Sequence, residues 1–177
     1  ACGPELCHVS GWRGHIYYQK ELTVYPESLL EELTKAGLQP GECPCVTTRF
    51  TRSIDRDGTS LAHDLHQAIT ESRNLILNRM QSHDWDLLVA GLCAGHCAGH
   101  QLWHYQDPDC AEHLTANADN PLQAIYRALD QATGDIIAEL PSDATLLVFI
   151  GPGMGPCHAH PALMGELLDA LDPPKSR

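Results

Sequence analysis

Residues 85–103 read WDLLVAGLCAGHCAGHQLW, and this stretch decides the expected fold. It begins with an apolar run over 87–92, which is typical of a strand buried on both faces. Side chains of the metal-binding type follow it: Cys93, His96, Cys97 and His100, with His104 one helical turn later. A buried strand that delivers such side chains at its carboxyl end is the usual way in which an α/β protein builds a site.

A second apolar run, residues 145–150, ends in GPGMGP. The spacing of apolar residues between the two runs predicts a helix over 122–140. A strand, a helix and another strand in this order predict a right-handed parallel crossover between strands 86–92 and 145–150. Further helices are predicted from Pro26 to Gly37, over 60–82 and over 162–171.

The sequence therefore predicts an α/β fold, with a parallel-containing sheet and helices on its faces. Its length suits a single domain, residues 1–177. Residues 1–59 form an N-terminal extension in this interpretation, and residues 60–172 form the α/β core.

Composition excludes some classes of function. The net charge of −12 argues against a nucleic-acid partner and against an anionic membrane surface. No segment is long and apolar enough to span a membrane, and no signal peptide is visible at the start. These features favour a cytoplasmic location, with the eight cysteines as reduced thiols. Disulfides stay open as an alternative if a leader was removed, since the chain starts without Met.

The cysteines and histidines of 93–104 recur at spacings of three and four. On a helix they would share one face, and thiolate and imidazole are the ligands that zinc and copper prefer. Gly91, Gly95 and Gly99 favour a loop over the first half, where helical spacing has no meaning. The alternative for Cys93 and Cys97 is that they are small buried residues near a strand end.

The segments WDLLVAGLCAGHCAGHQLWHYQDPD and NPLQAIYRALDQATGDIIAELPSDATLLVFIGPGMGP carry a resemblance. Together they resemble the core of the type I phosphodiesterase/nucleotide pyrophosphatase branch of the alkaline phosphatase superfamily, over about residues 60–170. The GHQLW at 99–103 and the GMGP at 153–156 are the most specific parts. The Tyr126 to Asp130 spacing matches a Y-x-x-x-D pattern on the family's intervening helix.

The resemblance implies an alkaline-phosphatase-like core fragment with an incomplete site. His100 falls on the family's histidine ligand of the first metal, and His96 falls where many members have an aspartate ligand. The family's Asp-His pair falls on Gly151 and Pro152, which cannot bind a metal through their side chains. Nothing in residues 1–59 resembles the strand that carries the family's Ser/Thr nucleophile. The family reaction needs two metals and an activated hydroxyl, so the resemblance implies the scaffold without the intact chemistry.

Three hypotheses follow for function. The first is a diverged or incomplete member of the superfamily with a His/Cys metal site, for zinc or another transition metal. Its candidate ligands are His96, His100, Cys93, Cys97, His104, Cys157, His158 and His160. The second is an active phosphodiester or sulfate ester hydrolase that another segment or chain completes, as a homo-oligomer or with a partner chain. The third is a non-catalytic module that binds a metal or a partner protein.

Overall fold

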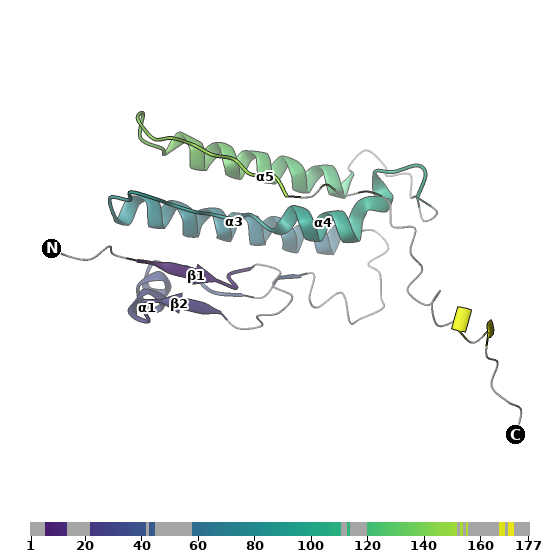
Figure 1. Ribbon diagram of the computed structural model, residues 1–177, viewed down its shortest axis with the longest axis horizontal. Coiled ribbons are helices and arrows are strands. Elements are labelled where there is room, and N and C mark those ends of the chain that lie inside the picture. The colour runs from purple at the N-terminus through teal and green to yellow at the C-terminus, as the bar shows by residue number, and fades with distance from the viewer. Residues whose placement is uncertain are drawn as a thin grey trace, which may run out of the picture.

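The computed structural model describes residues 6–13, 22–41, 43–44, 58–110, 113, 120–151, 153, 155, 167–168 and 170–171. Its elements are β1 (His8–Ser10), β2 (Thr23–Tyr25), α1 (Ser28–Lys35), α3 (Thr59–Ser82), α4 (Ala94–Leu102), the 3-10 turn η1 (Trp103–Tyr105) and α5 (Pro121–Ala138). Figure 1 shows them in layers, with α5 on one side of α3 and α4, and the β-hairpin and α1 on the other. The described part of the chain is mainly helical.

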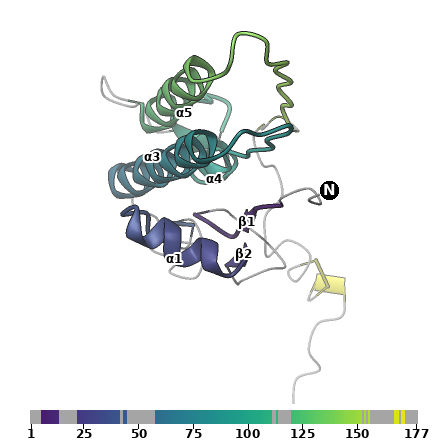
Figure 2. The same ribbon diagram turned by 90° about the vertical axis from the view of Figure 1, so that its left-hand side faces the viewer.

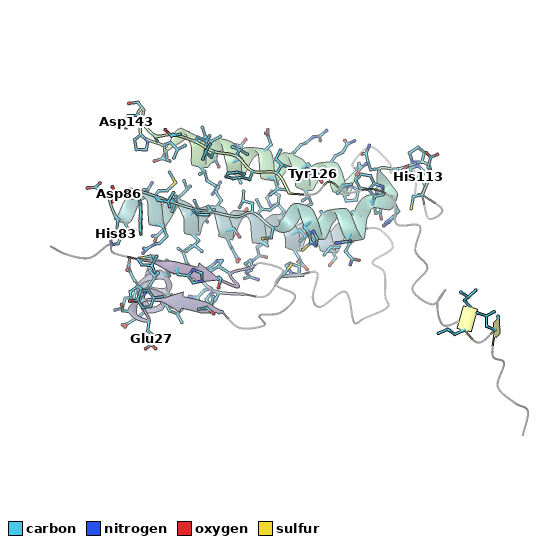
Figure 3. The ribbon with its side chains drawn as sticks, in the orientation of Figure 1. Glu27, His83, Asp86, His113, Tyr126 and Asp143 are labelled. Carbon is cyan, nitrogen blue, oxygen red and sulfur yellow. The ribbon has the colours of Figure 1, made fainter. Side chains whose placement is uncertain are left out.

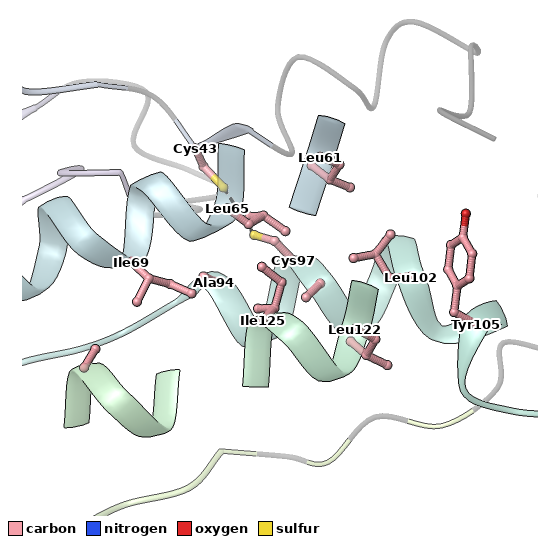
Figure 4. Packing of buried hydrophobic residues seen from close by; sticks show 12 residues of the cluster. Cys43, Leu61, Leu65, Ile69, Ala94, Cys97, Leu102, Tyr105, Leu122 and Ile125 are labelled. Carbon is pink, nitrogen blue, oxygen red and sulfur yellow. Dashed lines mark hydrogen bonds between the residues drawn. The ribbon is translucent and has the colours of Figure 1, made fainter. Parts of the chain in front are cut away.

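The helices α3, α4 and α5 share one apolar core. Leu65 of α3, Leu102 of α4 and Ile125 of α5 are each at most 2% exposed. The other buried members of this core are Cys43, Leu61, Ile69, Ala94, Cys97, Ala98, Tyr105, Leu122 and Ala132 (Figure 4). Each helix contributes a stripe at helical spacing, so burying these stripes against one another holds the three helices together.

Local sequence explains where two of the helices begin. The Asn120 side-chain oxygen accepts hydrogen bonds from the backbone N–H groups of Leu122 (2.9 Å) and Gln123 (3.2 Å), and Pro121 opens α5. Both are standard helix-start features. Gly58 precedes α3 with a φ of 62°, and a Cβ there would lie 2.9 Å from the ring of Tyr105. A side chain at this position would be strained by the positive φ and would clash with Tyr105, so the start of α3 requires a glycine.

A second core lies between the hairpin, α1 and the C-terminal half of α3. Strands β1 and β2 pair antiparallel, with Val9 opposite Val24. Trp12, Leu29, Leu33 and Leu75 are its buried members. This hairpin falls in a region where the sequence shows no clear period, because two strands of three residues each are too short to display alternation.

Ion pairs connect the layers, and two of them lower the pKa of their carboxylate. The Arg79 Nη2 of α3 donates to Glu32 Oε1 of α1 (2.6 Å), and this hydrogen bond holds the pKa of Glu32 below its usual value. The Arg73 Nη1 of α3 donates to Asp135 Oδ2 of α5 (2.7 Å). Hydrogen bonds from Gln131 and then from Arg73 lower the pKa of the Asp135 carboxyl. Both carboxylates are therefore stabilised in their charged form.

The predicted α/β fold is wrong. Among the described residues the sheet consists of β1 and β2 alone, antiparallel, so there is no parallel-containing sheet with helices on its faces. Neither 86–92 nor 145–150 is a strand. Leu87 and Val89 are 77% and 84% exposed, and Phe149 and Ile150 are 87% and 92% exposed. The two apolar runs lack the paired backbone neighbour that turns an extended segment into a strand.

These two extended segments nevertheless have a defined course. The chain leaves α3 and α5 at the same end of the molecule, where Asp86 and Asp143 lie (Figure 3). From there each segment runs back along its helix toward the α4 end, and both follow the same side of the helices (Figures 1 and 2). Among the described residues neither segment pairs as a strand, so the predicted parallel crossover between 86–92 and 145–150 is wrong.

The predicted helices have a different outcome. Helices α3 and α5 confirm the helices predicted over 60–82 and 122–140, and α1 confirms the one predicted after Pro26. Residues 167–168 and 170–171 are helical, and the rest of the helix predicted over 162–171 lies outside the described residues. Within the described ranges, no helix combines the length and the apolar character that crossing a bilayer requires.

Candidate functional site

Helix α4 carries the ligand-type residues of the sequence on two different sides. Cys97, Ala98 and Leu102 face the core and are at most 2% exposed. His96 and His100 lie on the exposed side. The predicted loop over the first half of this segment is therefore wrong, because the helix begins at Ala94.

Gly95, one of the glycines that favoured a loop, has a packing role in α4 instead. A Cβ on Gly95 would lie 3.1 Å from Leu129 Cδ1 of α5, which is tighter than ordinary contact. Its missing side chain therefore lets α4 approach α5 closely. The close approach buries Ala94 and Ala98 and leaves the opposite side of α4 open.

The two exposed imidazoles form a pair. His96 and His100 stand four residues apart, so one helical turn places them on the same face. Their ring centroids are 4.5 Å apart, with an angle of 84° between the ring planes. Two imidazoles at this spacing on one helix face are the arrangement by which helices present a pair of nitrogen ligands to a zinc ion.

Cys93 stands beside this pair at the start of α4. It is the N-cap residue, it is exposed, and its side chain makes no capping hydrogen bond. Its backbone oxygen accepts from the N–H of His96 at 3.1 Å. The position is about one helical turn before His96, so helical spacing places it on the same side of α4 as the histidine pair.

Cys97 does not belong to the exposed group. Its side chain is 1% exposed, and its Sγ lies 3.2 Å from Sγ of Cys43, which is also buried. The side chain of His104 lies beyond the end of α4, in η1, where its ring packs on that of Tyr105 at a centroid distance of 4.4 Å. The backbone oxygen of His104 accepts from Nδ1 of His113 at 3.0 Å.

The structure thus divides the predicted ligand set. It brings the rings of His96 and His100 together, and it places Cys97 in the core. Cys157, His158 and His160 lie outside the described residues. Within the part of the chain that the structure describes, no three His, Cys, Asp or Glu side chains converge as a metal site. The histidine pair therefore offers two imidazole rings on one face of α4.

Two residues that shape this region were not identified from the sequence. Cys43 is 54 positions away from Cys97, and no local pattern could reveal their contact. Asp107 fixes the turn after η1: Trp103 Nε1 donates to its Oδ2 and the backbone N–H of Asp109 donates to its Oδ1, both at 2.9 Å. The D-x-D spacing at 107–109 is the signal that could have revealed this turn.

Two hollows lie near the site. A cavity of about 20 Å³ borders the start of α4, and Trp12, Leu92 and Cys93 are among its lining residues. That volume is about the size of one water molecule. A shallow groove on the other side of the helices is lined by Trp103, Gln106, Leu122, Gln123, Tyr126 and Arg127. Neither hollow is lined by His96 or His100, so the histidine pair stands on an open surface.

The positions assigned by the superfamily resemblance are partly visible. His96 and His100 form the pair described above, and Gly151 is exposed with no side chain to offer a metal. Pro152 lies outside the described residues. In comparisons with known proteins, no family model, no curated protein and no solved structure matches this chain.

Proposed function

We propose that this chain is a metal-binding module in which His96 and His100 chelate a transition-metal ion, zinc first, on the exposed face of α4. The observation that carries the proposal is the ring geometry of the pair, with centroids 4.5 Å apart on one helix face. The residue types fit the metal, because neutral imidazole nitrogen is a preferred ligand of zinc and copper.

The rigidity of α4 supports this role. A metal site is tight when its ligands are held in place before the ion arrives. Both histidines project from a helix whose other side is anchored in the core by Cys97, Ala98 and Leu102. The backbone under the pair is therefore fixed, and metal binding has to order little more than the two imidazole rings.

Zinc prefers four ligands, and the pair supplies two of them. Cys93 is the proposed third ligand because its thiol is exposed one turn before His96, and the thiol would have to turn toward the pair, since no three ligand-type side chains of the described residues converge. Water completes the set in this proposal. A site with water-filled positions binds its ion more weakly than a closed four-ligand structural site, so we expect reversible binding at the surface.

In ancestry, we propose a diverged member of the alkaline phosphatase superfamily that kept histidines at ligand positions and lost ester hydrolysis. His100 at the family's ligand position supports this ancestry. Gly151 and Pro152 at the positions of the Asp-His pair support the loss of activity, since they leave the second metal without side-chain ligands. The role of His96 and His100 as ligands does not depend on this ancestry, because it rests on their geometry in α4.

The test is a calorimetric titration of the reduced protein with Zn²⁺. His96→Ala and His100→Ala should each lower the affinity of one site by at least roughly tenfold, by comparison with the effect of altering second-shell groups. His63→Ala is the matched control, since His63 is an exposed histidine of α3 whose side chain is 78% exposed. Cys93→Ser should weaken the same site if the thiol is the third ligand.

Equal zinc affinities in the parent protein, His96→Ala and His100→Ala would overturn the proposal. Circular dichroism of each variant supplies the folding control, because both side chains are exposed and their removal should leave the helical signal unchanged. An aryl phosphodiester assay of the parent protein tests the proposed loss of hydrolysis separately. Ordinary turnover that His100→Ala abolishes would refute the loss of activity while supporting the ligand role.

A further inference from the structure

Two buried thiols meet in the core of the helical layers. Cys43 and Cys97 are 2% and 1% exposed, and their Sγ atoms are 3.2 Å apart. Figure 4 shows the two side chains facing each other beside Leu65. Cys43 comes from the segment that follows α1, and Cys97 comes from the middle of α4. The contact joins parts of the chain that are 54 residues apart in sequence.

The distance between the sulfurs is that of two thiols in contact, and it exceeds the disulfide bond length of about 2.05 Å. The sulfurs must therefore approach by about 1.1–1.2 Å for a disulfide to form. We propose that Cys43 and Cys97 form a reversible disulfide that links the segment after α1 to α4. This modification site is separate from the proposed metal site, because Cys97 faces the core while His96 and His100 face outward.

The reaction balances as thiol–disulfide exchange with a small-molecule disulfide such as oxidised glutathione. The thiolate of one cysteine attacks a sulfur of that molecule, its S–S bond breaks, and one glutathione leaves as thiolate. The thiolate of the second cysteine then attacks the mixed disulfide, and the second glutathione leaves. The two protein thiols lose two electrons and two protons, and the small disulfide gains both as two thiols.

Burial sets the conditions for this exchange. Both sulfurs are buried, so the reagent can reach one of them only through local opening, and oxidation should be slow. Once formed, the bond is covered by Leu61, Leu65 and the other members of the core. The crosslink also closes a long loop, which restricts the unfolded chain and should raise the thermal midpoint of the oxidised protein.

The test is peptide mapping of the full chain after equilibration with oxidised glutathione. Remaining thiols are alkylated, the protein is digested, and mass spectrometry identifies the linked peptides. The expected result is a crosslinked species that joins Cys43 to Cys97, that disappears after reduction, and that accompanies a higher thermal midpoint. Cys97→Ser should abolish this species. Cys110→Ser, at a cysteine outside both the core and the proposed metal site, should keep it.

Three results would overturn the proposal. One is a map in which Cys43 and Cys97 stay alkylatable after prolonged equilibration. Another is a map in which either sulfur joins a different cysteine in the folded protein. The map of the unaltered chain decides between these outcomes even where a serine variant fails to fold. Retention of glutathione on one of the two cysteines, with no crosslink, would also count against the pair.

Discussion

Replacing Phe149 by Ala should barely change the stability of this protein, whereas replacing Ile125 by Ala should change it strongly. Phe149 is 87% exposed, which leaves about 13% of its surface covered. Full burial of such a side chain contributes about 1.5–3 kcal/mol, so the covered part contributes only about 0.2–0.4 kcal/mol. Ile125 is 1% exposed in the core of α3, α4 and α5, and Ile→Ala at such a site costs about 2–5 kcal/mol.

The assay is urea unfolding followed by circular dichroism at the helical wavelength. With a denaturant slope of about 2 kcal/mol/M, Ile125→Ala should lower the midpoint by roughly 1–2.5 M, and Phe149→Ala by about 0.1–0.2 M. If Ile125→Ala does not fold, Ile125→Val takes its place with an expected cost of about 0.5–1.5 kcal/mol.

The opposite ranking would refute the reasoning. A loss of about 3 kcal/mol or more for Phe149→Ala is the cost of emptying a buried aromatic site. That result would mean that 145–150 is covered on folding, as the apolar run alone suggests. Ile137→Ala is a further comparison, because Ile137 is an α5 residue that is 42% exposed and should give an intermediate loss.

Two further predictions concern the helix start of α5 and the link between α1 and α3. Asn120→Ala should destabilise the protein by about 1 kcal/mol in urea unfolding, because two N–H groups of α5 lose their acceptor; Asn120→Asp, which keeps the acceptor, should lose less. The pKa of Glu32 is lowered in the folded state, so its contribution is fully present above pH 4.5 and is lost as the pH falls through the lower folded value. Glu32→Gln should therefore flatten the fall in thermal midpoint below pH 4.5, and an unchanged fall would contradict the role of its hydrogen bond with Arg79.

Helices α1, α3 and α5 could be predicted from the sequence because each has a local signal, whereas the glycines of α4 favoured a loop. Leu61, Leu65 and Ile69 recur at helical spacing and are buried in α3, and Asn120–Pro121 marks the start of α5. The strands could not be predicted in the same way. An apolar run such as 145–150 shows hydrophobicity, but a strand also needs a hydrogen-bonding neighbour, and that neighbour is a property of the tertiary structure.

The candidate site shows the same division. The spacing of His96 and His100 predicts a shared face on a helix, and the two rings do lie together on α4. The same spacing predicted Cys97 on that face, but the side chain of Cys97 is buried in the core. Ligand-type residues at spacings of three and four spread over a face about 100° wide, so the edge of the core passes between Cys97 and His100. The partner of Cys97 is Cys43, a long-range contact with no local signal.

The most direct test of the proposed metal site is to observe the imidazole nitrogens of the protein by ¹H–¹⁵N NMR during a titration with Zn²⁺. The chain has eleven histidines, and variants assign the signals of His96 and His100. The account predicts that one nitrogen of each of these two rings shifts together and saturates at the same zinc concentration, while the signals of exposed His63 stay in place. If His96 and His100 keep their shifts while zinc binds to other histidines, the exposed face of α4 is not a metal site.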